Sequence, residues 1–489
     1  MSENNEVRFD PMTGQPVQGG QTDDQRQTEG QNAFDPLAGP QKSNKKNTKI
    51  LIGVIIGVIA VIVIAFVICI ASGVFLSKNA KVIKAAANTF EPNELIKDLD
   101  ASSQLEGGNY TVAVEMEGES YGENFELKAS YQQNTAKKKH AVNGKFVYSG
   151  TSVDFHEYMD EEELLVSIPK LYPDTFGYYF NEEKDGYLAE LLGDDFFEAF
   201  DDLCTTSMND MASSTKMAAE YTKILKDNYN ALEFETVEKE VFKVDGKDRK
   251  CKGYTTTLTE ENVGACLDEL SEVYSEYNKN TVNDVKTMFE AVGLEDDELA
   301  ELDNNIFDTL KEEIEDMPDL DVTFYIYKNR LAAVCVTGTD ETGDMKLDIE
   351  FRGGTTPTQN TIITYTLNGD GGSIKILGKT EDSVEKTKIV EVYEGEKTTL
   401  MDINYDYKNK ELEVKAEDGG FTATIDNSEK GLVIDFKDIA DESIDLTVTL
   451  KKGSNIKKPE QDVFNIGTAS EQDFYDLFYD IEDFTKELQ

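Results

Sequence analysis

The sequence predicts an α+β fold in which a large, curved antiparallel β-sheet (a meander) carries two helical insertions and a C-terminal helix. A single transmembrane helix and a disordered tail precede it. Three observations lead to this prediction: apolar and polar residues alternate over most of 106–185 and 321–452, two stretches between them have helical periodicity, and residues 50–77 are uncharged and apolar. Alternation is typical of strands with one buried face, and three- and four-residue spacing is typical of amphipathic helices.

Residues 1–49 are rich in Gln, Gly, Asn and Pro and lack apolar periodicity, which predicts a disordered cytoplasmic tail. Within this tail the segment 9–14, FDPMTG, is echoed by the segment 34–39, FDPLAG. The repeated pattern is either a short docking motif for a cytoplasmic partner or a chance echo in a biased composition.

Residues 50–77 are predicted to cross a membrane, since about 20 apolar residues suffice to span the hydrocarbon core. The alternative is a cleaved signal peptide, with Ala71-Ser72-Gly73 as the cleavage site. The run is longer than a signal h-region, and 49 residues precede it instead of a short basic segment. We therefore expect a single-pass anchor.

Lysines flank the span on both sides, four before it and three after it, so the positive-inside bias is slight. We expect a cytoplasmic N-terminus and an extracellular C-terminal domain in the cell membrane. Gly53 and Gly57 form a GxxxG spacing that lets two helices approach closely, which is compatible with a transmembrane homodimer.

The remaining elements follow in chain order within an exported domain, 78–489. We expect a helical stalk over 79–105, strands over 106–185, helices over 186–231, strands over 232–258, helices over 259–317, strands over 321–452 and a helix over 470–488. Thr259 can cap the second helical insertion, and Pro318 ends it. The last helix starts at a capping-box pattern, Ser470 to Asp473.

The apolar face of that last helix holds six large side chains and should pack on the sheet or, less simply, on a partner protein. Its members are Phe474, Leu477, Phe478, Ile481, Phe484 and Leu488.

The charge of the chain is strongly negative, −49 in total. The tail holds six basic and seven acidic side chains and the span holds none, so 48 of these net charges belong to 78–489. Such a charge argues against binding nucleic acid or an anionic lipid surface, because phosphates would be repelled. The carboxylates are either a solvating coat or a place for divalent cations such as calcium. The run Asp160–Glu163 is expected to be a solvated turn.

Catalytic signatures are weak, and the sequence predicts no enzyme and no cofactor. The chain has two His and no Trp, so imidazole-based nucleophile pairs and most zinc sites have few candidate members. Ser213–Lys216 matches SxxK, but no KTG triplet accompanies it. Gly378-Lys379-Thr380 lies beside an expected strand instead of a phosphate loop, and the segment 368–371 is better explained as a hairpin turn than as a calcium loop.

Four cysteines lie in the exported part: Cys204, Cys251, Cys266 and Cys335. They can be buried free thiols or form one or two disulfides, and the spacing does not rank the three pairings.

Several segments together resemble a group of uncharacterised, membrane-anchored surface proteins of clostridial bacteria: the polar tail, the single span, and the segments 81–86, 164–171 and 464–471. The resemblance implies the anchored topology and no particular activity. The half-open sheet with inserted helices is also similar to the LolA/LppX-type lipid- and lipoprotein-carrier fold, which implies an apolar cavity between the sheet and its helices.

From these observations we expect a non-enzymatic cell-surface protein whose exported domain binds an envelope protein or ligand. The alternative is a lipid or lipoprotein carrier with a LolA-like cavity.

Overall fold

The computed structural model describes residues 80–120, 123–292, 305–315, 317–340, 343–354, 356–417, 419–439 and 443–487. The chain divides into two units, Met1–Ile50 and Leu51–Gln489, and every described residue belongs to the second. The predicted tail 1–49 and span 50–77, with Gly53 and Gly57, lie outside the described residues. Among the helices within the described ranges, none has the length and hydrophobicity that crossing a bilayer requires.

Twenty strands in the described ranges form one sheet. They are β1 (Asn109–Ser120), β2 (Glu123–Asn134), β3 (Lys139–Tyr148), β4 (Thr151–Met159), β5 (Glu163–Ser167), β6 (Thr175–Tyr179), β7 (Glu235–Val244), β8 (Lys247–Leu258), β9 (Leu320–Tyr327), β10 (Arg330–Asp340), β11 (Gly343–Phe351), β12 (Asn360–Leu367), β13 (Asp370–Glu381), β14 (Val384–Tyr393), β15 (Glu396–Asp406), β16 (Glu411–Ala416), β17 (Gly419–Ser428), β18 (Gly431–Lys437), β19 (Asp445–Lys452) and β20 (Val463–Asn465).

The α-helices of the described ranges precede, interrupt and follow the strands. They are α2 (Ala80–Thr89), α3 (Glu94–Asp98), α4 (Ser102–Leu105), α5 (Tyr187–Leu192), α6 (Asp194–Ala231), α7 (Glu260–Ala291), α9 (Ile306–Ile314) and α10 (Glu471–Glu487). The predicted α+β class, antiparallel meander, helical insertions and C-terminal helix are therefore confirmed.

The strands do not follow one another across the sheet from β1 to β20. β7 forms one edge, and β8 to β19 follow it in sequence order. β19 then pairs with β1, and β1 to β6 continue to the other edge. All of these pairs are antiparallel, and the parallel strand β20 completes the edge beside β6. The chain therefore enters the sheet in its interior.

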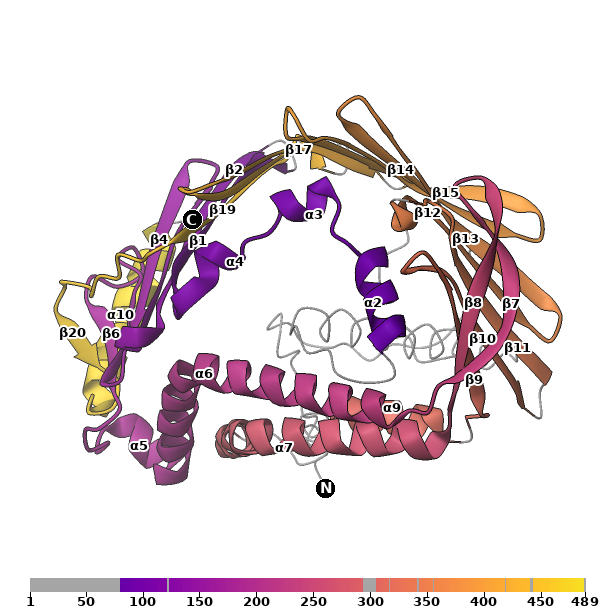
Figure 1. Ribbon diagram of the computed structural model, residues 1–489. Helices are drawn as coiled ribbons and strands as arrows, with labels where there is room; N and C mark the ends of the chain where they lie inside the picture. Colours follow the sequence, from indigo (N-terminus) through magenta and orange to yellow (C-terminus); the bar gives the residue numbers. More distant parts are fainter. Residues whose placement is uncertain are drawn as a thin grey trace, which may run out of the picture. The chain divides into compact units, whose positions relative to one another are not determined.

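The connection from β6 to β7 must carry the chain from one end of the sheet to the other. It does so through α5 and the 38-residue helix α6, which contains up to about 57 Å of helix at 1.5 Å per residue. α7, inserted between β8 and β9, lies along α6, and the pair crosses the gap between the two ends of the curved sheet (Figure 1).

Each end of α6 is held by an apolar cluster. Near its start, Phe197 and Cys204 pack against side chains of β4, β6 and the residue that follows β6. These side chains are Met159, Tyr178 and Phe180. Near its end, Tyr229 joins the cluster built on β8–β12. α7 begins with the predicted cap, because the Thr259 hydroxyl accepts a hydrogen bond from the Asn262 N–H at 3.2 Å.

The segment expected to be a stalk is part of the core. α2, α3 and α4 lie along the concave side of the sheet (Figure 1). Val82, Ala85 and Ala86 of α2 are at most 2% exposed and pack among side chains of β8–β12. α3 is tied to the sheet by Asp98, which accepts hydrogen bonds from Tyr405 and Lys410. The helices predicted over 79–105 are confirmed, but they do not form a stalk, because the apolar face of α2 needs a partner and the concave face supplies it.

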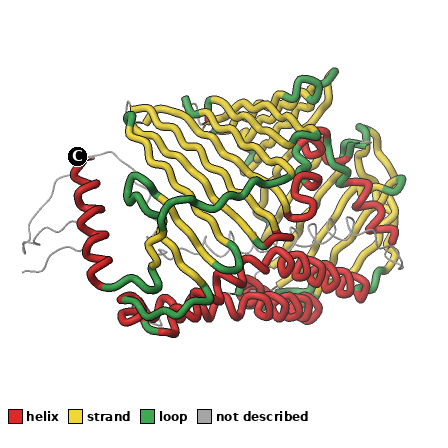
Figure 2. Tube along the Cα trace, turned by 90° about the vertical axis from the view of Figure 1, so that its left-hand side faces the viewer, coloured by secondary structure: helices red, strands yellow, loops and turns green. Residues whose placement is uncertain are grey.

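Residues 453–462 form a strap that crosses the outer side of the sheet from β19 toward β6 (Figure 2). Its Lys458 ammonium lies 2.6 Å from the Glu163 carboxylate, and Glu163 is only 6% exposed. The prediction that residues 160–163 form a solvated turn is therefore wrong for Glu163, which is buried. A strap from the far end of the chain covers that residue, which local sequence cannot indicate.

α10 starts with the predicted capping box, in which Ser470 and Asp473 bond each other's backbone N–H groups. Phe474 packs against Tyr187 and Phe464, and Leu477 is buried. Phe478 departs from the prediction, since it is 62% exposed.

We expect Lys458→Met to lower the free energy of unfolding by about 1–3 kcal/mol, because it leaves the buried Glu163 carboxylate without its cation. Urea or thermal unfolding of the full chain measures this. Lys457→Met, at an exposed neighbouring position, is the control, and Glu163→Gln combined with Lys458→Met should recover part of the loss. Equal effects of Lys457→Met and Lys458→Met would contradict the prediction.

Candidate functional site

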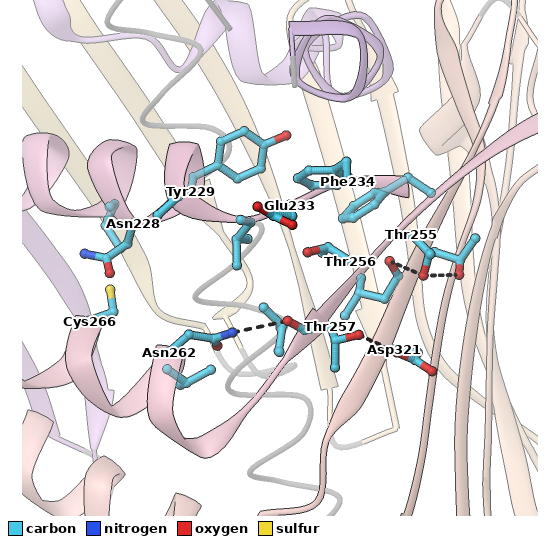
Figure 3. Close-up of a pocket in the computed structure, with 18 of the residues that line it drawn as sticks. Asn228, Tyr229, Glu233, Phe234, Thr255, Thr256, Thr257, Asn262, Cys266 and Asp321 are labelled. Atoms are coloured by element: carbon cyan, nitrogen blue, oxygen red, sulfur yellow. Dashed lines mark hydrogen bonds between the residues drawn. The ribbon is translucent and has the colours of Figure 1, made fainter. Parts of the chain in front are cut away.

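The candidate site is a pocket of about 920 Å³ where the end of α6 passes into β7. We call it the apolar pocket. α7 and α9 border it on one side, β8 and β9 on another, and Ile83 of α2 closes part of it. Figure 3 shows the end of α6, the start of β7 and α7 facing one another across it. Its volume lies within the range of about 300–1,000 Å³ that ligand pockets occupy.

Most of the wall is aliphatic or aromatic. The apolar members from the helices are Ile83, Leu225, Leu232, Val263, Leu267, Leu270, Leu310 and Ile314, and those from the strands and their approaches are Phe234, Val237, Leu258, Val322 and Phe324. These side chains belong to two core clusters, one built on α2 and β8–β12 and the other on α6, α7 and α9. The pocket is the space that remains where the two clusters meet.

Polar side chains of the wall hydrogen-bond largely to one another. The Thr323 hydroxyl donates to the Thr255 hydroxyl at 3.0 Å, and the Thr257 hydroxyl donates to Asp321 at 2.7 Å. The Asn262 amide donates to the Thr257 carbonyl at 3.2 Å (Figure 3). Because these groups are already paired, the wall offers a ligand mainly apolar surface.

The charged members of the wall are all acidic. Glu233, Glu235 and Asp321 are exposed, and the described lining residues include no Lys, Arg or His. A ligand with an anionic head group would meet repulsion at these carboxylates, whereas a neutral or cationic head group would not.

Cys266 contributes a thiol to the α7 side of the pocket. Burial, with a smaller effect of the nearby Glu269 charge, raises the pKa of the Cys266 thiol to about 11. The thiolate is the nucleophilic form, so Cys266 is a weak nucleophile at neutral pH. None of the four cysteines of the described part forms a disulfide, so the alternative with one or two disulfides is not the one observed.

The sites weighed on sequence grounds lie elsewhere. Gly53 and Gly57 are outside the described residues. Lys379 is an exposed residue of β13, and the segment 368–371 contains the turn between β12 and β13, as predicted. Among the described residues no three His, Cys, Asp or Glu side chains are grouped to hold a metal ion, and binding of calcium stays a prediction.

Sequence reasoning assigned no residue to the apolar pocket, although the resemblance to the LolA/LppX-type fold implied a cavity between the sheet and its helices. Its wall comes from segments between Ile83 and Thr337 that are separated in the sequence, and each apolar residue taken alone is typical of a core position. The apolar faces of both helical insertions did indicate that these helices pack on other apolar surfaces. The pairing of those insertions with each other is what leaves the space.

Comparison with known proteins finds no matching family model, no similar curated protein and no similar solved structure.

We expect the rate at which iodoacetamide modifies Cys266 to rise about tenfold per pH unit from pH 7 to pH 9, because the thiolate fraction grows in this way below a pKa of about 11. Peptide mapping by mass spectrometry after timed alkylation measures the rate at this residue. Free cysteine, with an ordinary pKa of about 8.5, is the control and should level off within the same range. A plateau for Cys266 near pH 8.5 would contradict the prediction.

Proposed function

We propose that this chain is a single-pass, membrane-anchored cell-surface protein whose C-terminal domain binds an apolar ligand with a neutral or cationic head group. The observation that carries the proposal is the apolar pocket, a space of about 920 Å³ with an aliphatic and aromatic wall and three carboxylates. Burial of apolar surface contributes about 25 cal/mol per Å², so a ligand with one long hydrocarbon chain is the chemistry that this wall favours.

A binding role is better supported than a catalytic one. The nucleophilic side chain of the wall, Cys266, is kept protonated by burial, and no imidazole lies beside it in the described lining. The hydroxyls of Thr257 and Thr323 are engaged with Asp321 and Thr255. The general acid-base candidates of the described wall are the carboxylates Glu233, Glu235 and Asp321, which are exposed.

The second candidate is a lipid or lipoprotein carrier. It is favoured by the same pocket lying between helices and a curved sheet, as the resemblance to the LolA/LppX-type fold implies. A carrier must release its ligand to an acceptor, whereas a receptor or sensor retains it.

Native mass spectrometry of the full chain purified from cells would reveal a bound lipid, and transfer of that lipid to acceptor vesicles would favour the carrier.

Because the chain contains no Trp, one introduced Trp reports on its own surroundings. We expect the emission of Phe234→Trp in the pocket to shift to shorter wavelength and saturate on titration with monoolein, a neutral lipid. Phe478→Trp on the exposed face of α10 is the matched aromatic control and should not respond. Oleate should bind several-fold more weakly than monoolein, because its carboxylate meets Glu233, Glu235 and Asp321.

An unchanged Phe234→Trp spectrum with monoolein, oleate and oleylamine would contradict a ligand site. A response to oleate stronger than to monoolein would contradict the assigned head-group preference while leaving the pocket itself as a binding site.

The proposed topology gives a separate expectation. Protease added to intact cells should digest the chain after Lys78 and leave residues 1–49 protected, as measured with antibodies against tags at the two ends. Lysed cells are the control, in which both ends should be digested. Protection of the C-terminal domain in intact cells would reverse the orientation.

A further inference from the structure

A second, smaller cavity of about 240 Å³ lies near the ends of β8 and β9 that are remote from the apolar pocket. Three chain reversals meet there: the β7–β8 turn at Asp245, the β9–β10 turn at Lys328 and the loop that follows β11. They are joined by hydrogen bonds from the Asp245 N–H to the Arg352 carbonyl (3.0 Å) and from Arg330 Nη1 to the Gly354 carbonyl (3.2 Å). We call this cavity the rim site.

The rim site gathers positive charge in a chain where acidic residues outnumber basic ones, 97 to 48. Its lining holds three cations, Arg249, Lys328 and Arg330, and one carboxylate, Asp245. Glu91 lies outside the lining, 3.8 Å from Arg330, and its side chain is 68% exposed. The local balance of charge is therefore opposite to that of the domain.

Tyr327 contacts two of these cations. The Arg249 guanidinium carbon lies 5.5 Å from the centre of the Tyr327 ring, and the Lys328 ammonium lies 5.6 Å from the same centre. Both distances are within the roughly 6 Å over which a cation is attracted to a ring face. The Tyr327 ring therefore helps to position two of the three cations that line the cavity.

Arg249 also carries an unsatisfied donor. Its Nε is buried and has no hydrogen-bond partner in the described part of the chain. A buried donor left unpaired costs about 1–3 kcal/mol. The guanidinium fork matches the oxygen spacing of phosphate and carboxylate groups.

From the cavity and its three cations, two of which contact the Tyr327 ring, we propose that the rim site binds the phosphate group of a small molecule or lipid. Three cations suit a group that can carry two negative charges better than a singly charged carboxylate. The remaining negative charge of the domain does not prevent this, because exposed charges farther away than about 8 Å are largely screened at 0.15 M salt. The proposal is independent of the apolar pocket and its ligand.

Isothermal titration of the detergent-solubilised full chain with inorganic phosphate, in 0.15 M sodium chloride, tests the proposal. We expect saturable binding that Arg249→Gln and Lys328→Gln each weaken about tenfold or more. Lys430→Gln, at an exposed lysine beside the β17–β18 turn, is the matched control and should leave binding unchanged. Lys328 lies in an exposed turn, so its variant keeps the test valid if Arg249→Gln fails to fold.

No saturable binding of phosphate, or an equal loss in Lys430→Gln, would overturn the proposal. Acetate should bind at least tenfold more weakly than phosphate, and equal binding would overturn the assignment to phosphate. Flotation with vesicles that contain phosphatidic acid identifies the source of the group: binding that is lost in Arg249→Gln and Lys328→Gln indicates a lipid head group, and no flotation together with phosphate binding indicates a soluble ligand.

Discussion

The pairing of β1 with β19 is the constraint on which the rest of the domain depends. It is antiparallel and runs in register from Tyr110 opposite Lys452 to Glu117 opposite Asp445. At its end the Thr111 hydroxyl donates to the Gly453 carbonyl, 342 residues away along the chain. This ladder joins the strands β1–β6 to the meander β7–β19, and without it the domain would consist of two separate sheets.

A sheet of this width has to curl, since strongly twisted open sheets rarely exceed about ten strands while staying extended. Curling creates a concave side, along which α2–α4 lie. It also leaves two edges of the sheet, at β7 and β20, that face solvent or helices. Both edges carry features that discourage pairing with another chain. β7 is rich in exposed Glu and Lys and has a bulge between Val237 and Glu240, and β20 is only three residues long.

Sequence patterns therefore predict where the strands and helices lie along the chain much better than they predict which strands are neighbours in the sheet. Alternation predicted the strands, and helical periodicity predicted the two insertions and α10, because these signals are local. The β1–β19 ladder, the strap over Glu163 and the burial of α2 depend on partners hundreds of residues away. The residues that line the apolar pocket and the rim site could not be predicted for the same reason, since each is enclosed by segments that only the folded sheet brings together.

The β1–β19 ladder also bears on how the domain folds. Pairing between distant segments requires closure of a long loop and slows folding, so a chain with this topology cannot acquire its native sheet by local steps alone. During synthesis from the N-terminus, β1 to β6 emerge first, and the edge of β1 that β19 will cover stays open until residue 452 has appeared. The high negative charge matters at this stage. Mutual repulsion between growing chains keeps the open edge of β1 from pairing with a strand of a neighbouring chain.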